Sequence, residues 1–160
     1  FSRCDIFNHI LSGRQRMKIS TRGRYALRMM LDMVLSDSDK PVRVKEIAER
    51  QEISEKYMEQ IMSILNKAGF VRSVRGPQGG YFLTKKPEEY TVGMILRLTE
   101  GSLSPVDCLE EGAPVCNRVD SCTTILLWRK LDDAIRGVVD HVTLQDLVDW
   151  SQEQNHDYII

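Results

Sequence analysis

The feature that most constrains this 160-residue chain is an amphipathic segment that leads directly into two short strands joined by a glycine-rich turn. Residues 54–68 have helical periodicity, with Ser54 placed to cap the N-terminus and Gly69 placed to end the helix. Residues 71–75 and 81–83 have strand character, and the turn between them contains three glycines and one proline. This stretch predicts a helix followed at once by a β-hairpin.

Two further amphipathic segments precede this stretch, and a third follows it. Apolar residues recur at helical spacing over 22–35, 44–51 and 91–99. Three helices followed by a hairpin is the order of a winged helix-turn-helix. We therefore expect a mainly α protein with a small β-hairpin, in which residues 17–100 form a winged helix-turn-helix DNA-binding domain.

One face of the 54–68 helix is polar. At about 100° per residue, four polar side chains lie within about 60° of one another, and these are Lys56, Gln60, Ser63 and Lys67. In the major groove of DNA, Gln60 can pair with adenine, and Lys56 and Tyr57 can reach bases or phosphates. An ordinary solvated face is the alternative, which is disfavoured here because a basic hairpin follows directly.

The hairpin adds positive charge at a turn that can approach DNA closely. Arg72 and Arg75 flank the turn, and Gly76 and Gly79 leave its backbone without side chains. An arginine at such a tip benefits from the negative potential of a narrow minor groove. The alternative is a hairpin whose arginines only keep its surface soluble.

The start of the first helix carries residues that can contact phosphates. They are Lys18, Thr21, Arg22 and Arg24. Such contacts would add affinity that depends on salt and not on base sequence. Alternatively, these side chains are ordinary surface charge.

Charge is divided unevenly along the chain, although the net charge is only −1. Residues 17–86 hold 14 Lys and Arg against 8 Asp and Glu, whereas residues 87–160 hold 5 against 14. A basic half joined to an acidic half is typical of a nucleic-acid-binding module with a separate regulatory or assembly module. Two merely solvated surfaces would give the same division.

Three cysteines lie on the polar segment 101–122, which we expect to form a sensor loop. The spacing of Cys108, Cys116 and Cys122 differs from that of zinc knuckles and contains no C-x-x-C redox pair. A wide loop could wrap a cluster larger than one ion, and thiolates are the usual ligands of iron–sulfur clusters. Reduced thiols without a metal are the alternative.

The segment 123–160 is expected to form a dimerisation helix and a C-terminal tail. Over 123–142, apolar residues recur in steps of three and four, as in helices that pair with a partner. These residues are Trp128, Leu131, Ile135, Val138 and Val142. A core-facing stripe is the alternative, but the preceding loop is too polar to cover it alone. Residues 143–150 predict a short closing helix.

Several classes of protein are disfavoured by the sequence. The longest apolar run, 125–128, is far shorter than the roughly 18 residues of a membrane span. We expect no enzyme, because no nucleotide-binding loop, serine-hydrolase motif or zinc-protease motif occurs.

Residues 1–16, with Cys4, contain no secretory signal, and we interpret them as a tag or an over-long N-terminal extension. A cytoplasmic protein with reduced thiols is therefore expected.

Three stretches carry a specific resemblance. They are MKISTRGRYAL at 17–27, ISEKYMEQ at 53–60 and VRGPQGGY at 74–81. From Met17 to about Trp150, the chain resembles the Rrf-type family of bacterial winged helix-turn-helix transcriptional regulators, which has IscR, NsrR and CymR types. The run CTTILLWRKL at 122–131 is similar to the cysteine-containing branch that binds iron–sulfur clusters.

The resemblance implies a homodimeric regulator that binds a double-stranded DNA operator and dimerises through the 123–142 helix. It assigns DNA contacts to Lys56, Tyr57, Gln60 and the wing residue Arg75, and it matches Glu59 to a position that helps to select among operator classes. The N-cap residue Ser54 is a further candidate for a DNA contact. It also implies that Cys108, Cys116 and Cys122 hold a 2Fe-2S or 4Fe-4S cluster, which protein purified in air can lack.

Two departures from the family pattern leave the fourth cluster ligand unassigned. The IscR type takes it from a histidine where Ile125 stands, and the NsrR type takes it from an aspartate where Arg24 stands. The candidates are Asp107, Glu110, His141 or a group from the other subunit.

Regulation without a cluster is a second hypothesis. In the CymR type, a partner enzyme of cysteine biosynthesis supplies the signal. A thiol-redox or metal-storage protein is a third hypothesis, and it predicts no effect of Gln60 or Arg75 substitutions.

Overall fold

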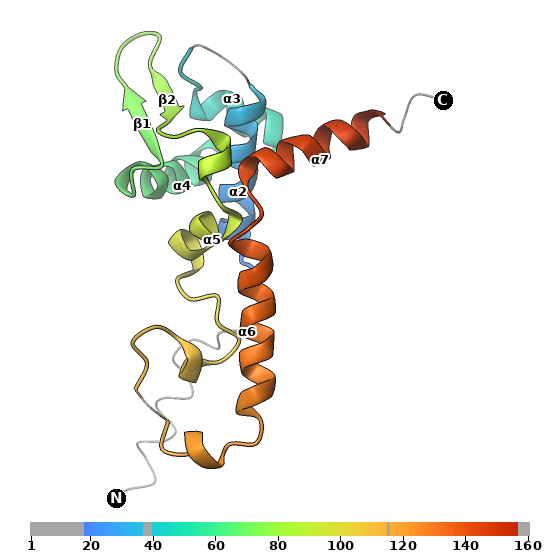
Figure 1. Cartoon of the computed structure of the whole chain (residues 1–160). Coiled ribbons are helices and arrows are strands. Elements are labelled where there is room, and N and C mark those ends of the chain that lie inside the picture. The colour runs from blue at the N-terminus through green and yellow to red at the C-terminus, as the bar shows by residue number, and fades with distance from the viewer. Residues whose placement is uncertain (1–17, 37–39, 115, 157–160) are drawn as a thin grey trace, which may run out of the picture.

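The computed structural model describes residues 18–36, 40–114 and 116–156, and the expected N-terminal extension 1–16 lies outside these ranges. Figure 1 shows a head that contains the hairpin and a long helix that extends below it. The segment that precedes this long helix runs along one side of it. The described residues confirm the expected class, which is mainly α with one two-stranded antiparallel hairpin.

Three helices form the centre of the head: α2 (Thr21–Leu35), α3 (Val44–Gln51) and α4 (Glu55–Lys67). Their inward faces contribute a methionine-rich core, which includes Ala26, Met29, Met30, Met33, Ile47, Met58, Ile61, Met62 and Leu65. Methionine is unbranched, so it fills irregular gaps between packed helices. The helix bounds agree closely with the three predicted segments. Gly69, with a φ of 74°, follows the C-cap of α4.

The hairpin pairs β1 (Val71–Val74) with β2 (Gly80–Leu83). Its second strand also bridges to Val42, two residues before α3, because the amides and carbonyls of Val42 and Tyr81 bond each other at 2.9 and 2.8 Å. A Cβ at Gly80 would lie 2.6 Å from the Val42 carbonyl oxygen, so this close approach requires glycine. The hairpin is therefore fixed to the helical part of the head.

A buried tyrosine joins the end of the hairpin to α5 (Val92–Glu100), after the short 3-10 turn η1 (Pro87–Glu89). The Tyr90 hydroxyl donates to the Phe70 carbonyl at 2.7 Å and accepts from the backbone amides of Thr84 and Lys85. Tyr90 is fully buried, so all of its polar capacity is met inside the protein.

The helix expected over 123–142 is shorter in the structure, where α6 spans Ile125–Val139 and α7 spans Leu144–His156. The helix ends because the following residues pair with the start of α5. The Val142 carbonyl accepts from the Val92 amide at 2.8 Å, and Thr143 bridges to Thr91. Val142 therefore lies outside α6, in contrast to its expected place on the dimerisation helix. The closing helix α7 is longer than the predicted 143–150.

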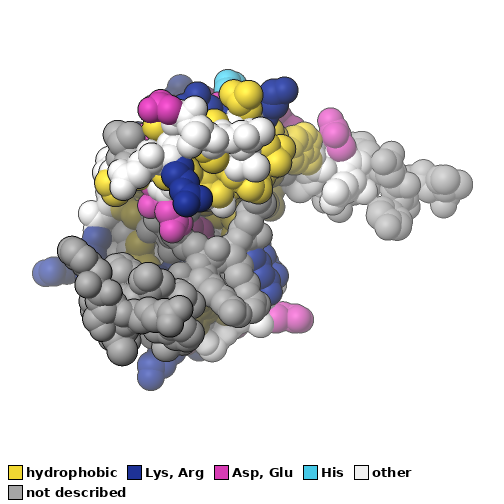
Figure 2. All heavy atoms as spheres, turned by 90° about the horizontal axis from the view of Figure 1, so that it is seen from below, with side chains coloured by type: hydrophobic (Ala, Val, Ile, Leu, Met, Phe, Trp, Pro, Cys, Tyr) yellow, Lys and Arg dark blue, Asp and Glu magenta, His cyan; other side chains and the backbone are white. Residues whose placement is uncertain are grey.

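Helix α6 is poorly covered by its own chain. Asp132 is its only buried residue, whereas the side chains of Leu126, Leu127 and Val138 are 65%, 56% and 60% exposed. Figure 2, which shows the molecule from below, has hydrophobic side chains exposed among the described residues of this face. Among the described residues, every helix is too short or too polar to span a bilayer.

Candidate nucleic-acid interface

The N-terminal half of α4 presents polar side chains on an anchored helix. Lys56, Glu59 and Gln60 are exposed, while Met58, Ile61, Met62 and Leu65 are buried in the core of the head. The burial fixes the helix, and the exposed face keeps its side chains available for hydrogen bonds. No described residue forms a hydrogen bond or ion pair with Lys56 or Gln60. The structure thus brings these two predicted site residues onto one exposed helix face.

Ser54 occupies the N-cap position of α4, as expected. Its side chain makes no capping hydrogen bond within the described structure, and it is exposed. An exposed hydroxyl at a helix N-terminus lies where the positive end of the helix dipole favours an anion.

Tyr57 connects the first turn of α4 to α2. Its ring packs edge-to-face on Tyr25 with the ring centroids 5.9 Å apart, and the guanidinium of Arg28 lies 5.6 Å from the Tyr25 ring. Tyr57 is half-buried, so part of its surface packs against the head and part stays accessible. This contact places the N-terminal part of α2 beside the N-terminal part of α4.

The residues expected to contact phosphates are exposed around the start of α2. Lys18, Thr21, Arg22 and Arg24 share this exposure, and an Arg24 nitrogen donates to the Thr21 hydroxyl at 3.2 Å. The helix start is held by the Ser20 hydroxyl, which donates to Glu100 Oε1 at 2.6 Å and accepts from the Gly23 amide.

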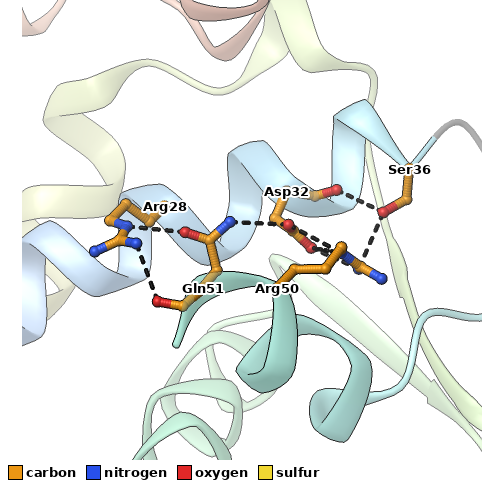
Figure 3. A network of polar contacts seen from close by, with 5 residues as sticks. All are labelled: Arg28, Asp32, Ser36, Arg50 and Gln51. Atoms are coloured by element: carbon orange, nitrogen blue, oxygen red, sulfur yellow. Dashed lines mark hydrogen bonds and ion pairs between the residues drawn. The ribbon is translucent and has the colours of Figure 1, made fainter. Parts of the chain in front are cut away.

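A polar network that sequence reasoning missed braces the turn before α4 (Figure 3). Arg28 donates to the side chain and the carbonyl of Gln51, and Gln51 donates to Asp32 at 2.9 Å. Arg50 holds both oxygens of Asp32 and also bonds Ser36. The network ties α2 to the end of α3, and Glu52 then turns the chain with a φ of 55°.

The buried carboxylate of Asp32 is the centre of this network. Its side chain is 8% exposed, and the shortest distance to the Arg50 guanidinium is 2.6 Å. Hydrogen bonding to Asp32 raises the pKa of Arg50 above its ordinary value. Only one signal in the sequence could have indicated the network, which is the i, i+4 spacing of Arg28 and Asp32 on the first helix.

The hairpin tip is held against the head by another arginine that sequence reasoning missed. A terminal nitrogen of Arg43 donates to the Pro77 carbonyl at 2.7 Å. A Cβ at Gly79 would lie 2.4 Å from the Val74 carbonyl oxygen, so the tight turn requires this glycine. Gly76 has a φ of 118°, which also favours glycine.

The two arginines of the hairpin have different environments. Arg72 lies over the Phe82 ring, 4.7 Å from its centroid, so a cation–π contact within the hairpin engages it. Arg75 is exposed, and no described residue pairs with it. Figure 1 shows that the hairpin and α4 lie on the same side of the head, away from α7.

The three candidate cluster ligands are not brought together. Cys108 and Cys116 are exposed and Cys122 is half-buried, all as free thiols. Among the described residues, no group of three or more His, Cys, Asp or Glu side chains could hold a metal ion. The thiols have the right chemistry for an iron–sulfur cluster, but their arrangement does not fit one. The candidate fourth ligands Asp107, Glu110 and His141 do not complete a site either.

Cys122 differs from the other thiols because it lies just before α6. Its sulfur is 3.4 Å from the Thr124 hydroxyl oxygen. This hydroxyl, and to a smaller extent the backbone amides of Thr124 and Ile125, lower the pKa of the Cys122 thiol. A lowered pKa favours the thiolate form.

The exposed apolar stripe of α6 is offset from the predicted one. Trp128, Leu131 and Ile135 are half-buried, whereas Val138 is exposed. The exposed apolar residues of α6 are Leu126, Leu127, Ala134 and Val138. With half-buried Leu131, the last three recur in steps of four, three and four, and these four residues are called the seam of α6. The predicted dimerisation residues do not include Leu127 or Ala134, which a heptad frame that begins at Leu127 would contain.

Comparison with known proteins gives a consistent result. A family model described as "Rrf2: Iron-dependent Transcriptional regulator" matches residues 19–150. The regulator CymR of Bacillus subtilis is 38% identical over 143 residues, which cover 89% of this chain and 98% of the relative. The regulator IscR of Pectobacterium atrosepticum is 42% identical over 132 residues, which cover 82% of this chain and 79% of the relative.

Solved structures agree with these sequence matches. The structure of B. subtilis CymR, described as the global cysteine regulator, superimposes with a TM-score of 0.68 at 41% identity, and covers 83% of this chain and 97% of its own. The structure of T. potens IscR has a TM-score of 0.69 at 39% identity, with 86% and 90% covered. These relatives are named as transcriptional regulators and not as enzymes.

Proposed function

This chain belongs to the Rrf2 family of transcriptional regulators, and from that premise we propose that it binds a DNA operator as a homodimer. The observation that carries the proposal is the exposed polar face of α4, which the buried core of the head holds in place, while the Asp32 network ties the preceding helix α3 to α2. We assign this helix to the major groove and the hairpin to the adjacent minor groove. Such a regulator acts in the bacterial cytoplasm.

The proposed contacts fall into two groups. Side chains from the first turns of α4 read base edges, and these are Lys56, Tyr57, Glu59 and Gln60. Residues near the starts of α2 and α4 and on the hairpin contact the DNA backbone and the minor groove. These residues are Lys18, Thr21, Arg22, Arg24, Ser54, Arg75, Gly76 and Gly79. All of these residues except half-buried Tyr57 and Gly79 are exposed, which supports the assignment, as does the close turn at Gly79.

Dimerisation would cover the exposed seam of α6. The seam residues Leu127, Leu131, Ala134 and Val138 recur in steps of four, three and four, which suits pairing with a second copy. Half-buried Trp128 and Ile135 would lie beside this contact. Two heads joined in this way would bind two half-sites of a pseudo-palindromic operator.

Operator binding can be tested with DNA selected from a random pool by the full-length protein. Gln60→Ala and Arg75→Ala should each weaken binding by about 1–3 kcal/mol, and Gln60→Ala should also relax preference at one base pair. Arg129→Ala serves as the control for Arg75→Ala, because it removes the same positive charge from an exposed position on α6. This variant should bind the operator normally. Equal binding by all variants would contradict the proposed interface.

We also propose that the segment 101–122 is the sensing element, through its three thiols. The lowered pKa of Cys122 and the exposure of Cys108 and Cys116 support a thiol-based sensor. An iron–sulfur cluster on these thiols would require the segment to rearrange from its described conformation, because the thiols are not gathered there. Iron and sulfide analysis of anaerobically purified protein, with a Cys→Ser triple variant as reference, tests this proposal. Unchanged metal content and operator affinity in the variant would contradict it.

Regulation without a cluster is the second candidate function. The ungathered thiols favour it, and so does the similarity to CymR over 98% of that relative's length. Under this alternative, metal-free protein binds the operator fully, and a partner such as an enzyme of cysteine biosynthesis adjusts the affinity. Operator binding by metal-free and metal-loaded protein separates the two candidates.

A further inference from the structure

A polar cavity lies where α5, the segment 101–111 and α6 meet, apart from the proposed DNA-binding face. Its volume is about 270 Å³. Its charged lining comes from all three elements and consists of Arg97, Glu110, Glu111, Asp132 and Arg136. Figure 1 shows the segment beside α6, below the head. The cavity is therefore lined by the head, the cysteine-bearing segment and the proposed dimerisation helix.

One carboxylate of this cavity has an unmet hydrogen-bonding requirement. Glu110 Oε1 is buried, and no described group donates a hydrogen bond to it. A buried acceptor without a donor is costly, which makes such groups rare in native proteins. The terminal torsion of a glutamate is soft, so this oxygen can turn toward a donor placed in the cavity. A carboxylate oxygen in this position suits a cationic donor, because charge-assisted hydrogen bonds are stronger than neutral ones.

An arginine on the opposite element provides the complementary group. Arg136 uses its Nε to donate to Asp132 Oδ2 at 2.7 Å, and the other Asp132 oxygen accepts from the Ser104 hydroxyl at 3.0 Å. Asp132 is therefore satisfied, while the two terminal nitrogens of Arg136 bond no other described residue. Arg97 differs, because both of its terminal nitrogens hold Asp140. Arg136 remains as a guanidinium fork that suits a carboxylate.

We propose that the cavity binds a free α-amino acid with a small uncharged side chain. The ligand's ammonium group donates to Glu110, and its carboxylate accepts from Arg136. Leu103 and Ile135 also line the cavity and contact the ligand's side chain. The volume is below the roughly 300–1,000 Å³ of pockets for drug-sized ligands, which suits a molecule of amino-acid size.

The consequence for regulation rests on the proposed function, whereas the binding itself does not. A bound amino acid would join the segment 101–111 to α5 in the head and to α6 at the dimer contact. A ligand that favours one arrangement of these elements shifts the population toward it, and with it the spacing of the two heads on DNA. The cavity would then make operator affinity depend on amino-acid concentration.

Calorimetric titration of the reduced, metal-free full-length protein tests the site directly. The probes are glycine, L-alanine, L-serine, L-valine and L-methionine, each titrated separately, and we expect at least one to bind. Glu110→Gln should weaken that binding by roughly tenfold to a hundredfold, because it removes the charge that pairs with the ammonium. Its free energy of unfolding should be unchanged or higher, since no native hydrogen bond of Oε1 is lost. Glu88→Gln, at an exposed carboxylate of η1, is the matched control and should bind normally.

The N-acetyl and amide derivatives of the tightest probe separate the two ends of the ligand. The N-acetyl derivative should lose the Glu110 pairing, and the amide should lose the Arg136 pairing. The proposal is overturned if no probe binds, if Glu110→Gln and Glu88→Gln bind alike, or if the N-acetyl derivative binds as well as the free amino acid. Binding without any change in operator affinity would leave the site intact and remove only its regulatory role.

Discussion

In the head, side chains of α2, α3 and α4 are buried completely against one another, whereas on α6 the side chains of Leu126, Leu127 and Val138 are more than half exposed. Helices α2 and α4, with 15 and 13 residues, are amphipathic and similar in length to α6, with 15 residues, so the difference is not one of helix type. The head completes its core within one chain. Helix α6 has an apolar seam that its own chain leaves uncovered, which is the condition that favours a second copy.

The largest expected effect concerns the interior of the head. Met62→Ala removes a fully buried side chain and should lower the free energy of unfolding by about 2–5 kcal/mol. Leu126→Ala, at a position 65% exposed on α6, should cost less than about 1 kcal/mol. Urea denaturation of both variants measures the contrast. Similar costs for the two substitutions would show that α6 is covered more fully than the monomer indicates.

The next effect concerns the seam of α6. Val138→Asp places a charge in the proposed dimer contact, so the protein should become monomeric and lose operator affinity by about a hundredfold. Analytical ultracentrifugation and operator titration measure these changes. Gly137→Asp introduces the same charge one residue away, where a Cβ has no neighbour within 4 Å. A monomeric Gly137→Asp variant, or a dimeric Val138→Asp variant, would place the contact elsewhere.

A smaller effect is expected from the network that braces α3 against α2. Asp32→Asn removes the charge that pairs with Arg50 but keeps one acceptor oxygen. The free energy of unfolding should therefore fall by about 1–2 kcal/mol. The Arg50 side chain is 44% exposed, so water can replace part of the lost interaction. Glu49→Gln removes the exposed Lys45–Glu49 pair and should cost less than about 0.5 kcal/mol. If both variants unfold alike in urea, Asp32 does not brace the head.

The smallest effect concerns the ion pair that joins α5 to the residues after α6. Hydrogen bonding to Arg97 lowers the pKa of Asp140 below its ordinary value, so the folded state binds this proton less readily than the unfolded state. The pair therefore contributes stability above the unfolded pKa, and this stability is lost as the pH falls through the folded pKa, below about 4. Because both side chains are more than a third exposed, the contribution should be less than about 1 kcal/mol.

Asp140→Asn should remove this part of the pH dependence. Unfolding free energies measured for wild type and variant should differ near neutral pH and converge in acid. A constant difference across the whole range would show that the loss is one of packing and not of charge.

The prediction from sequence was most successful where local signals agreed. Ser54 and Gly69 marked the ends of α4, and the glycine-rich turn marked the hairpin, because caps and tight turns depend on a few neighbouring residues. The end of α6 was predicted less well. Val142 continues the apolar spacing, but its carbonyl bonds the Val92 amide, a partner fifty positions away that no local pattern reveals.

The candidate site also contains some features that the local sequence predicts and others that depend on distant residues. Lys56 and Gln60 could be assigned to one helix face from periodicity alone, and the structure has both exposed there. Arg43, Arg50 and Gln51 could not be identified, because their roles depend on Pro77 and Asp32 in other elements. The cysteines were expected to share a site from their closeness in sequence, yet the segment that carries them does not gather the thiols.

The amino-acid sequence alone determined the fold class, the order of elements and the polar face of α4, since these follow from hydrophobic periodicity and turn chemistry over short stretches. Only the tertiary structure decided which face of α6 stays uncovered, which side chains brace α3 against α2 and which charged groups surround the cavity beside α5. These features depend on contacts between residues far apart in the chain, and a linear pattern contains no information about which distant surfaces meet.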